Sequence, residues 1–595
     1  MCGIGGLLFS TENRAALGRK MSAINALQRH RGPDGQFFLV LDQHAFCHQR
    51  LALLDAEGGQ QPFRDREGRY IMVYNGELYN YLELKKKLNG KYQFVTNSDT
   101  EVVLAAFIVW GEACLQQFNG MFAFLIWDTH TATAFAARDP LGVKPFVYHQ
   151  HLGTFMFASE LKALLSVVNM QLEIDPYLLA EYVIAPYFSG GSSQAIFKNI
   201  HYLEPGSSLR IDGQGIYLQK YYSFNWKRTA ANERELVAST AQALEESVQQ
   251  SLRGDTPAGI FLSGGLDSSL IAAIAAQHAK EAPAAFSIAF DKHADIYFDP
   301  ATIVNSDDLP FAAALAKQLA LPFHKVTPQD NSLTHTLIQL AEINDRIPAW
   351  EQEFSQHFLA RAAATQLKVV LVGDAADETH YGYFFLLNAA INRSPMSLLN
   401  LFGGEKRMDL LAPPLRQHLQ SLSYFDELYQ GVAKQAGFDF SKGGEESILA
   451  MSALVNRRWL GRLLHNGDIH TMHYGVEARV PFANRNLLDV ASQVSPQLGF
   501  KNEVEKSILR QAAAKWLPPH YCSRKKSALP RDPRLGKAYQ SILRTLLVGE
   551  NGFIDAFLYR PALAALCDLE AISENDRMQL FNMICLIYWG RRYAK

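Results

Sequence analysis

The chain has few of the features that mark secreted, metal-binding or nucleic-acid-binding proteins. Its six cysteines form no CxxC pair, which argues against structural disulfides and a zinc site and predicts a reducing compartment. The 57 lysines and arginines nearly balance the 59 acidic residues, and the formal net charge is −2. Because no global basic field results, we expect neither nucleic acid nor an anionic membrane as a partner.

Long apolar runs are also lacking. The most apolar stretch, Val102–Trp110, is about half as long as a membrane-spanning helix. It follows Ser98–Glu101, which has the form of a capping box, so a buried helix of a soluble domain is the better interpretation. The N-terminal segment MCGIGGLLFS has neither the positive region nor the cleavage pattern of a signal peptide. We therefore expect a cytoplasmic protein.

At 595 residues the chain is too long for one core, and its length predicts two to four domains. The first part reads as short strands separated by turns, with helical stretches near Met21–Gln28 and Glu101–Phe118. This pattern favours an α+β domain over residues 1–210. The clearest strands are Ile71–Leu78, Met121–Asp128, Thr133–Asp139 and Phe155–Glu160.

Beyond the polar segment Ser223–Glu233 the pattern changes to strands that alternate with helices. This pattern predicts a mostly parallel sheet covered by helices on both faces. From about Leu387 the chain reads as largely helical, so a second domain is expected over residues 225–595. The predicted strands are Ala258–Leu262, Ala284–Phe290 and Lys368–Gly373, with helices after the first of them and at Leu309–Leu319.

One long polar segment, Asp291–Asp308, interrupts this second pattern. Loops of this length in compact domains tend to be functional lids or mobile surface segments. The sequence favours neither interpretation over the other.

Cysteine at position 2 is the first candidate for catalysis. Removal of the initiator methionine would leave Cys2 with a free α-amine, whose ordinary pKa near 8 suits it as the base for its own thiol. A lone cysteine there is weak evidence, but it is followed in order by further motifs. These are RHRGPDG (Arg29–Gly35), HQRLALLD (His48–Asp55), YNGELYN (Tyr74–Asn80), SDTE (Ser98–Glu101), ARDPLGVKP (Ala137–Pro145) and FASELKAL (Phe157–Leu164).

Over its first 200 residues the sequence thus resembles the class II, N-terminal-nucleophile glutamine amidotransferases, which implies a layered αββα fold. Glutamine is a zwitterion, so its pocket needs a cation and anions. The resemblance assigns Arg50 to the carboxylate, Asp99 and Glu77 to the α-amine, and Leu51 to the pocket. It also assigns the Asn75 amide and the Gly76 N–H to the oxyanion hole. His30 and His48 stay outside the catalytic set, because Cys2 activates itself.

The segment Ser263–Ser269 (SGGLDSS) lies between a predicted strand and a helix. Glycines allow close approach to a phosphate, and the helix N-terminus adds partial positive charge. The GxxxxGK[ST] of a Walker loop is absent. The segment resembles instead the pyrophosphate-binding loop of ATP pyrophosphatases, which implies ATP as co-substrate and Mg²⁺ on Asp267. The predicted ATP site comprises Leu262, Ser263, Gly264, Gly265, Asp267, Ser268, Ile288, Val372 and Gly373.

Val372–Glu378 (VGDAADE) resembles the SGEGxDE motif of asparagine synthetases, and Asp377 inherits the role of second Mg²⁺ ligand. GVEARVPF (Gly475–Phe482), EKSILRQA (Glu505–Ala512) and RKKSALPRDP (Arg524–Pro533) also resemble that family, and Lys506 matches the lysine that supports the adenylate. With both domains matched, the chain resembles glutamine-hydrolysing asparagine synthetases, EC 6.3.5 ligases that adenylate a carboxylate and amidate it with ammonia delivered through a tunnel. Small-molecule substrates, and a homodimer as in the family, are expected.

Several positions depart from that pattern around the acceptor. Asp374 replaces a glutamate of the amide-forming half and is about 1.5 Å shorter. Val372 removes a hydroxyl, Tyr381 replaces a glycine, and Pro348–Glu353 is bulky and acidic. Because acidic residues disfavour a second carboxylate, we expect an acceptor other than aspartate, such as a carboxylate of specialised metabolism. A divergent enzyme that still uses aspartate is the alternative.

Three other function classes are considered. The first is a synthetase-like cyclase, resembling β-lactam or lasso-peptide ring formers, in which an internal amine attacks the adenylate. Such proteins usually carry an inactive glutaminase, so an intact set of Cys2, Arg50, Asn75 and Asp99 argues against one. A phosphoribosyl or sugar-phosphate amidotransferase would lack SGGLDSS. A non-catalytic scaffold would not need two complete ligand constellations.

Overall fold

The computed structural model describes residues 2–593 except 169, 192, 228–231, 291–307, 329–332, 402, 420, 527–534 and 550–551. The predicted loop Asp291–Asp308 therefore lies outside the described residues, apart from Asp308 itself.

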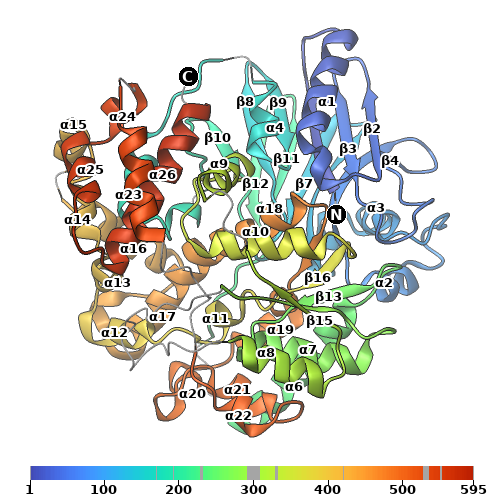
Figure 1. Ribbon diagram of the computed structural model, residues 1–595. Coiled ribbons are helices and arrows are strands. Elements are labelled where there is room, and N and C mark those ends of the chain that lie inside the picture. Colours follow the sequence, from blue (N-terminus) through green and yellow to red (C-terminus); the bar gives the residue numbers. More distant parts are fainter. Residues whose placement is uncertain are drawn as a thin grey trace.

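Two six-stranded antiparallel sheets form the first part of the chain (Figure 1). The first has the order β10-β8-β9-β1-β3-β2 and the second the order β12-β11-β7-β6-β5-β4. The strands of the first sheet are β1 (Cys2–Leu8), β2 (Gly35–Val40), β3 (Ala45–Arg50), β8 (Val147–His151), β9 (Thr154–Ala158) and β10 (Ile200–Tyr202). Those of the second are β4 (Phe63–Arg64), β5 (Tyr70–Glu77), β6 (Met121–Asp128), β7 (Thr133–Arg138), β11 (Ser207–Asp212) and β12 (Gly215–Lys220).

The two sheets stack face to face, and helices cover their outer faces. Ile4 and Phe46 of the first sheet share one core with Val73 and Leu125 of the second. Helix α1 (Arg14–Gln28) buries Leu17, Met21 and Ile24 against the first sheet, and α3 (Asp99–Trp110) packs on the second. This is the αββα layering that the sequence predicts, so the expected fold class is confirmed for this part.

The start of α3 shows why the sequence folds into a helix here. The Ser98 hydroxyl accepts a hydrogen bond from Thr100 N at 3.2 Å and caps the helix. The Glu101 carboxylate does not complete a capping box, because it accepts from Val95 N and Thr96 N instead. The α-helix ends at Trp110 and is followed by Gly111, whose φ of 59° only glycine adopts readily. It is thus shorter than the predicted stretch.

The second part contains one parallel sheet with the order β15-β14-β13-β16-β17. Helices α7, α8, α10 and α18 pack against its strands. The parallel sheet predicted from the alternating pattern is therefore confirmed. The strands are β13 (Ala258–Phe261), β14 (Ala285–Ile288), β15 (Phe323–Val326), β16 (Val369–Leu371) and β17 (Glu477–Arg479), and the helices are α7 (Leu266–His278), α8 (Leu309–Gln318), α10 (Gln352–Ala363) and α18 (Gly461–Met472).

After β16 the described chain is helical apart from β17, as the sequence predicts. The last helix, α26 (Glu574–Tyr593), packs on α23 (Leu535–Leu546) and α9 (Leu333–Ile343). Among the described helices, none combines the length and apolarity that crossing a membrane requires. The other α-helices between β16 and α26 are α11 (Ala376–Thr379), α12 (Phe385–Asn392), α13 (Met396–Leu401), α14 (Gly404–Met408), α15 (Pro413–Leu419), α16 (Ser423–Gln435), α17 (Gly444–Leu454), α19 (Arg485–Ala491), α20 (Pro496–Gly499), α21 (Ser507–Ala513), α22 (Pro519–Cys522), α24 (Gly552–Phe557) and α25 (Arg560–Cys567).

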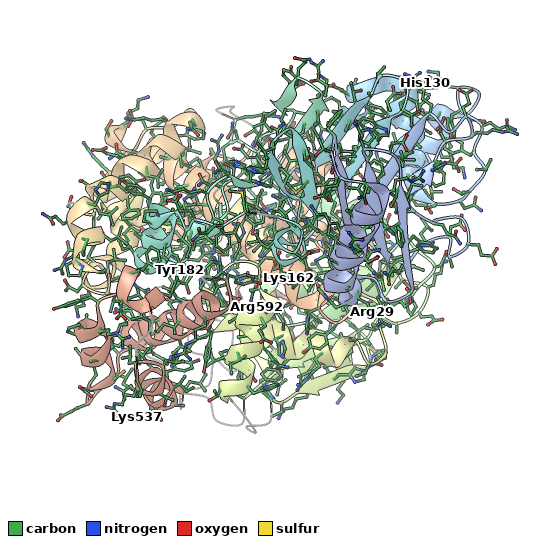
Figure 2. The ribbon with its side chains drawn as sticks, turned by 90° about the horizontal axis from the view of Figure 1, so that it is seen from above. Arg29, His130, Lys162, Tyr182, Lys537 and Arg592 are labelled. Atoms are coloured by element: carbon green, nitrogen blue, oxygen red, sulfur yellow. The ribbon has the colours of Figure 1, made fainter. Side chains whose placement is uncertain are left out.

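The two parts meet along a buried interface. Seen from above, Lys162 and Tyr182 lie toward the middle of the molecule, while His130 and Lys537 mark opposite ends (Figure 2). The Lys162 ammonium donates to Ile343 O at 2.9 Å, and the Tyr182 hydroxyl donates to Pro348 O at 2.6 Å. Side chains of the first part are thus anchored on the backbone of the second.

Candidate active sites

Cys2 lies at the start of β1, where the two sheets bring it against residues of both. Strand pairing places Cys2 opposite Arg50 of β3, and Cys2 N donates to Asn75 Oδ1 of β5 at 3.0 Å. The residue is 8% exposed, and burial raises the pKa of its thiol. A buried thiol of this kind needs a base beside it, which the α-amine of a processed Cys2 would supply.

Asn75 has a side-chain donor with nothing to bind. Its Oδ1 atom is used by Cys2 N, while its Nδ2 atom is buried without a hydrogen-bond partner among the described residues. Unsatisfied buried donors are rare and cost about 1–3 kcal/mol. A Cβ on neighbouring Gly76 would lie 2.4 Å from Met121 O, so only glycine fits there. The predicted oxyanion pair is therefore placed beside the thiol, with one donor still open.

A pocket opens next to Cys2 and is lined by every residue predicted to bind glutamine except Asn75. Arg50 donates to Asp55 O and Ala56 O and forms no ion pair in the described part of the chain. Its charge is thus available for a carboxylate. The lining comprises Cys2, Arg50, Leu51, Leu53, Leu54, Gly59, Gln61, Tyr74, Gly76, Glu77, Ser98, Asp99 and Thr100.

Two buried carboxylates, Asp99 and Glu77, complete this pocket. Asp99 Oδ2 accepts hydrogen bonds from the Tyr74 hydroxyl at 2.8 Å and from Leu78 N at 2.9 Å. Burial raises the pKa of Asp99, and it raises the pKa of Glu77 to about 8 although Arg479 acts in the opposite direction. Carboxylates that are costly to ionise alone favour an ammonium ligand, because its charge offsets the cost.

Arg479 is a neighbour of this pocket that sequence reasoning missed. It comes from β17 in the second part, lies 3.4 Å from Glu77 Oε2, and pairs with Glu477 at 2.5 Å. Both residues belong to the GVEARVPF motif, to which the sequence alone assigns no role. That motif was the available signal, but only the fold shows that it reaches the first part.

The two excluded histidines are not bonded to Cys2. His30 Nε2 lies 2.9 Å from Glu160 Oε1. His48 is buried, and both of its ring nitrogens lack a hydrogen-bond partner in the described structure. Burial lowers the pKa of His48 to about 3, so the ring is neutral at physiological pH. Their exclusion from the catalytic set stays a prediction.

The predicted nucleotide residues gather at one edge of the parallel sheet. Leu262 follows β13, Ile288 ends β14, and Val372 and Gly373 follow β16. These strands are neighbours and parallel, so their carboxyl ends meet at one edge, where ligands bind in open α/β sheets.

The turn between β13 and α7 is shaped for close approach of a ligand. Gly264 has φ +82°, and a Cβ there would lie 2.8 Å from Ala312 N. Ser263 N donates to Ser268 Oγ at 3.1 Å, which closes the turn. Gly265 caps α7 with no side-chain hydrogen bond, so the first N–H groups of the helix remain available to a phosphate.

The two predicted metal ligands converge on one lysine ammonium. Lys506 Nζ lies 2.6 Å from Asp267 Oδ2 and 2.6 Å from Asp377 Oδ1, and Lys526 Nζ lies 2.7 Å from Asp377 Oδ2. Gly382 permits this approach, because a Cβ there would lie 2.1 Å from Asp377 Oδ1. Although burial acts to raise it, the two lysines hold the pKa of Asp377 at about 2. Because the Asp267 and Asp377 carboxylates already lie on either side of one cation, the Lys506 ammonium, their arrangement also suits Mg²⁺.

No third acidic, histidine or cysteine side chain completes a metal cage among the described residues. Mg²⁺ is usually bound by one or two carboxylates together with phosphate oxygens and water, and Asp267 and Asp377 supply two carboxylates.

Strained backbone surrounds the same carboxylates. Ala375, Tyr381 and Lys506 have φ of 71°, 57° and 55°, in the left-handed region that non-glycine residues avoid. Ala375 and Tyr381 stand where the family motif has glycine. The Tyr381 ring packs between Trp226 and Phe500, and its hydroxyl donates to Val494 O at 3.0 Å. Strain held by packing in this way is typical of functional sites.

The acidic segment before this site is neutralised within the protein. Glu351 lies 3.1 Å from Arg577, and Glu353 accepts from Ala349 N at 2.7 Å and from Trp350 N at 3.2 Å. The Trp350 ring packs on Tyr187 and Trp459. The repulsion expected from this segment therefore loses its physical basis. Asp374 itself is partly buried, and burial together with Asp377 raises its pKa to about 6.

Comparison with known proteins agrees with both sites. The family described as glutamine amidotransferase domain matches residues 1–222, and the family described as asparagine synthase matches residues 239–591. Asparagine synthetase [glutamine-hydrolyzing] 3 of Bacillus subtilis is 30% identical, over 96% of this chain and 94% of its own. Asparagine synthetase B [glutamine-hydrolyzing] of Escherichia coli is 28% identical, over 88% and 81%.

These matches span both sheet systems and reach nearly end to end. The resemblance to this family expected from the sequence is confirmed. The chain therefore belongs to the glutamine-hydrolysing asparagine synthetase family, a family of ATP-dependent carbon–nitrogen ligases.

Proposed function

We propose that this chain releases ammonia from glutamine at Cys2 and uses it to amidate a carboxylate that ATP has activated. The observation that carries the proposal is the open Asn75 Nδ2 donor next to the buried Cys2, whose pocket contains a cation without an ion pair among the described residues and two carboxylates. A cyclase, in which an internal amine attacks the adenylate, would not require a pocket of this kind at Cys2.

In the first half-reaction the Cys2 thiol loses its proton to the Cys2 amine and attacks the glutamine side-chain carbonyl. Asn75 Nδ2 and Gly76 N–H donate to the oxyanion that forms. The C–N bond breaks, the amine returns the proton to the leaving ammonia, and water cleaves the thioester to glutamate. Arg50, and Asp99 with Glu77, hold the two charged ends of the substrate.

In the second half-reaction an oxygen of the acceptor carboxylate attacks the α-phosphorus of ATP, and pyrophosphate leaves. The N–H groups at the start of α7 and the Lys506 ammonium stabilise the polyphosphate charge. Mg²⁺, held by Asp267 and Asp377, would add further charge stabilisation to the phosphates. Ammonia then displaces AMP, and Asp374 accepts the proton that the new amide loses. This role requires an ionised Asp374, which its pKa of about 6 allows at neutral pH.

For the acceptor, we propose aspartate as the first candidate, because the acidic residues near Trp350 are paired internally. A larger carboxylate is the second candidate, and the shorter Asp374 favours it. We also propose a glutaminase domain that ends after Lys220 rather than at 210, because β11 and β12 pair into the second sheet. We propose, on the sequence alone, a second domain over residues 225–595, a homodimer and a cytoplasmic location.

The deciding experiment compares wild type with Cys2→Ala in three assays: glutaminase activity, ATP–pyrophosphate exchange over a panel of acids, and amide formation from ammonium. Cys2→Ala should lose glutaminase activity by at least about 10³-fold, because the nucleophile is absent. Exchange and ammonia-dependent synthesis should persist. Exchange with aspartate supports the first acceptor, and exchange only with another acid supports the second. Retained glutaminase activity in Cys2→Ala would refute the proposed nucleophile.

A further inference from the structure

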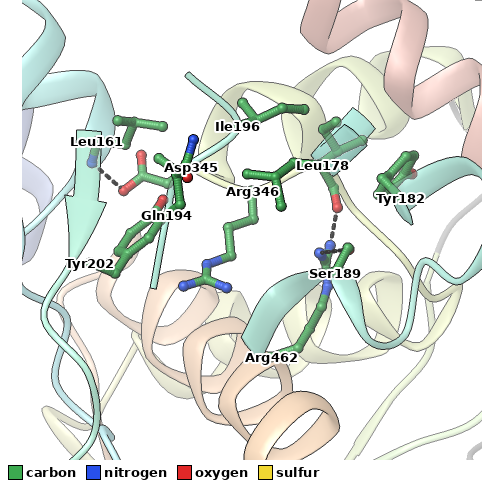
Figure 3. Close-up of a pocket in the computed structure, with 12 residues that line it drawn as sticks. Leu161, Leu178, Tyr182, Ser189, Gln194, Ile196, Tyr202, Asp345, Arg346 and Arg462 are labelled. Atoms are coloured by element: carbon green, nitrogen blue, oxygen red, sulfur yellow. Dashed lines mark hydrogen bonds between the residues drawn. The ribbon is translucent and has the colours of Figure 1, made fainter. Parts of the chain in front are cut away.

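A cavity at the interface between the two parts belongs to neither candidate site. Its volume is about 40 Å³, so only a compact ligand fits without movement of its walls. Leu178 and Ile196 of the first part give it apolar walls, whereas Tyr202, Arg346 and Arg462 are polar. Figure 3 shows the Arg346 side chain extending between Tyr202 and Arg462.

Two arginines in this cavity have unused hydrogen-bonding capacity. Arg462 is 1% exposed and donates to Ser189 Oγ at 3.3 Å and to Ile347 O, but its Nε has no partner. The Arg346 guanidinium stacks on the Tyr202 ring at 4.1 Å, and its buried Nε has no partner either. Neither arginine forms an ion pair with any residue that the structure describes. The Tyr202 hydroxyl, in a side chain 4% exposed, interacts with the Arg346 guanidinium but has no hydrogen-bond partner of good geometry among the described residues.

Nearby carboxylates form no ion pair with these arginines in the described part of the chain, although the charge of Glu353 acts on Arg462 from a greater distance. Asp345 lies in the cavity wall, but it accepts from Leu161 N at 2.5 Å and Lys162 N at 3.3 Å at the start of helix α4 (Leu161–Leu165). Glu353 accepts from two backbone N–H groups of its own segment. Buried charges without a partner are costly. Burial lowers the pKa of Arg346 to about 10, which leaves it charged at neutral pH.

Aromatic side chains separate this cavity from the nucleotide edge. The Arg462 guanidinium lies 5.9 Å from the Trp350 ring, which packs on Trp459 at 5.7 Å. Trp459 in turn packs on Tyr383 at 5.6 Å, and the Tyr383 hydroxyl bonds Glu378 next to Asp377. The cavity is thus behind this row of rings, not on the side of the metal ligands.

We propose that the cavity binds a small organic carboxylate. A planar carboxylate matches the guanidinium fork and would satisfy the open nitrogens of Arg346 and Arg462 and the Tyr202 hydroxyl. The apolar walls formed by Leu178 and Ile196 would take an aliphatic body. Because the lining comes from both parts of the chain, the bound ligand would bridge their interface. The site is independent of the glutaminase and adenylation chemistry.

The test is titration calorimetry of the full chain with isovalerate, without glutamine, ATP or Mg²⁺. Isovaleramide has the same shape without the charge and serves as the matched ligand control, and inorganic phosphate tests for a general anion site. We expect isovalerate to bind with a Kd below about 1 mM and isovaleramide to bind at least about tenfold more weakly. Arg346→Met should weaken isovalerate binding by about tenfold or more, and Tyr202→Phe by a smaller factor.

Arg14→Met is the control variant, because Arg14 is exposed and distant in the sequence. It should bind isovalerate as wild type does. Asp374→Asn should also leave binding unchanged, whereas weaker binding in that variant would place the carboxylate at the acceptor site and overturn the proposal. Equal binding of acid and amide, tighter binding of phosphate, or unchanged binding in Arg346→Met would overturn it as well. The acid–amide comparison uses wild type alone, so it stands even if a variant fails to fold.

Discussion

The interpretation of His48 as a structural residue is testable through pH, because the ring is buried. Burial lowers the pKa of His48 to about 3. As pH falls through about 6.5, His48 therefore binds a proton in the unfolded chain but not in the folded chain. Stability from this residue is complete above the unfolded pKa and falls as pH drops below it. Between about pH 7.5 and about pH 5.5 the loss should be about 1.4 kcal/mol.

Urea unfolding of wild type and His48→Leu at both pH values measures this loss. The variant should lose about 1.4 kcal/mol less than wild type on acidification, whatever its stability at neutral pH. Parallel losses in the two proteins would contradict the buried, neutral ring.

Ala375 occupies a left-handed conformation in which glycine would be relaxed. Its φ of 71° costs an alanine about 1–2 kcal/mol, while glycine adds about 0.4–1 kcal/mol of unfolded-state entropy. Ala375→Gly should therefore stabilise the protein by about 0.5–1 kcal/mol in urea unfolding. Ala279→Gly is the matched control, because Ala279 has φ −70° and its substitution should destabilise instead. A loss of stability in both variants would show that Ala375 is not strained.

At the residue scale the sequence identified the residues around the pocket next to Cys2, but not the hydrogen bonds and ion pairs that they form. The motifs predicted Cys2, Arg50, Asn75 and Asp99 as residues of the site. Residues of these types suit the hydrolysis of a zwitterionic substrate. The motifs could not show that Asn75 Nδ2 is open or that Arg479 reaches Glu77. Both facts depend on which strands lie side by side, and the spacing of motifs in one sequence does not contain that information.

At the element scale, the turn between β13 and α7 allows a test of whether its function requires a glycine at position 264, where neighbouring backbone atoms lie close. A Cβ on Gly264 would meet Ala312 N at 2.8 Å and Asp308 O at 2.9 Å, and φ is +82°. Gly264→Ala should shift the turn and reduce ATP–pyrophosphate exchange by about tenfold or more, with glutaminase activity retained. Gly90→Ala is the control, because Gly90 has φ +81° with nothing within 4 Å. Equal exchange activity in the two variants would rule out the steric explanation.

Elements with strong patterns were predictable, and short or glycine-rich ones were not. The strand at Met121–Asp128 matches β6 from end to end, because every position is apolar until the final aspartate. Strand β1 contains three glycines, and β17 has three residues. Neither offers a periodicity that marks a strand. Both are held by their neighbours, β1 between β3 and β9, and β17 beside β16.

At the scale of the whole molecule, α18 connects the two candidate sites. Arg31 donates to Cys2 O at 3.1 Å and pairs with Asp468 of α18 at 2.8 Å. Lys144 also pairs with Asp468, at 3.2 Å. The preceding residue, Gly467, lies against the other site, because a Cβ there would be 3.2 Å from Asp374 Oδ2. A single helical turn thus reaches the Cys2 backbone through Arg31 and lies against Asp374 at Gly467.

Asp468→Asn would leave Lys144 buried without its carboxylate partner and weaken the hold on Arg31. Removing one partner of a buried ion pair costs about 3–5 kcal/mol of stability. Because the amide retains part of the hydrogen bonding, we expect Asp468→Asn to lower the free energy of unfolding by about 3 kcal/mol. Amide formed per glutamine hydrolysed should fall, because the two sites lose their common support, while glutaminase activity alone changes little. Asp409→Asn, which breaks the exposed pair with Arg416, should change neither quantity. If Asp468→Asn lowers stability but keeps the wild-type ratio of amide to glutamate, α18 supports the fold without coupling the sites.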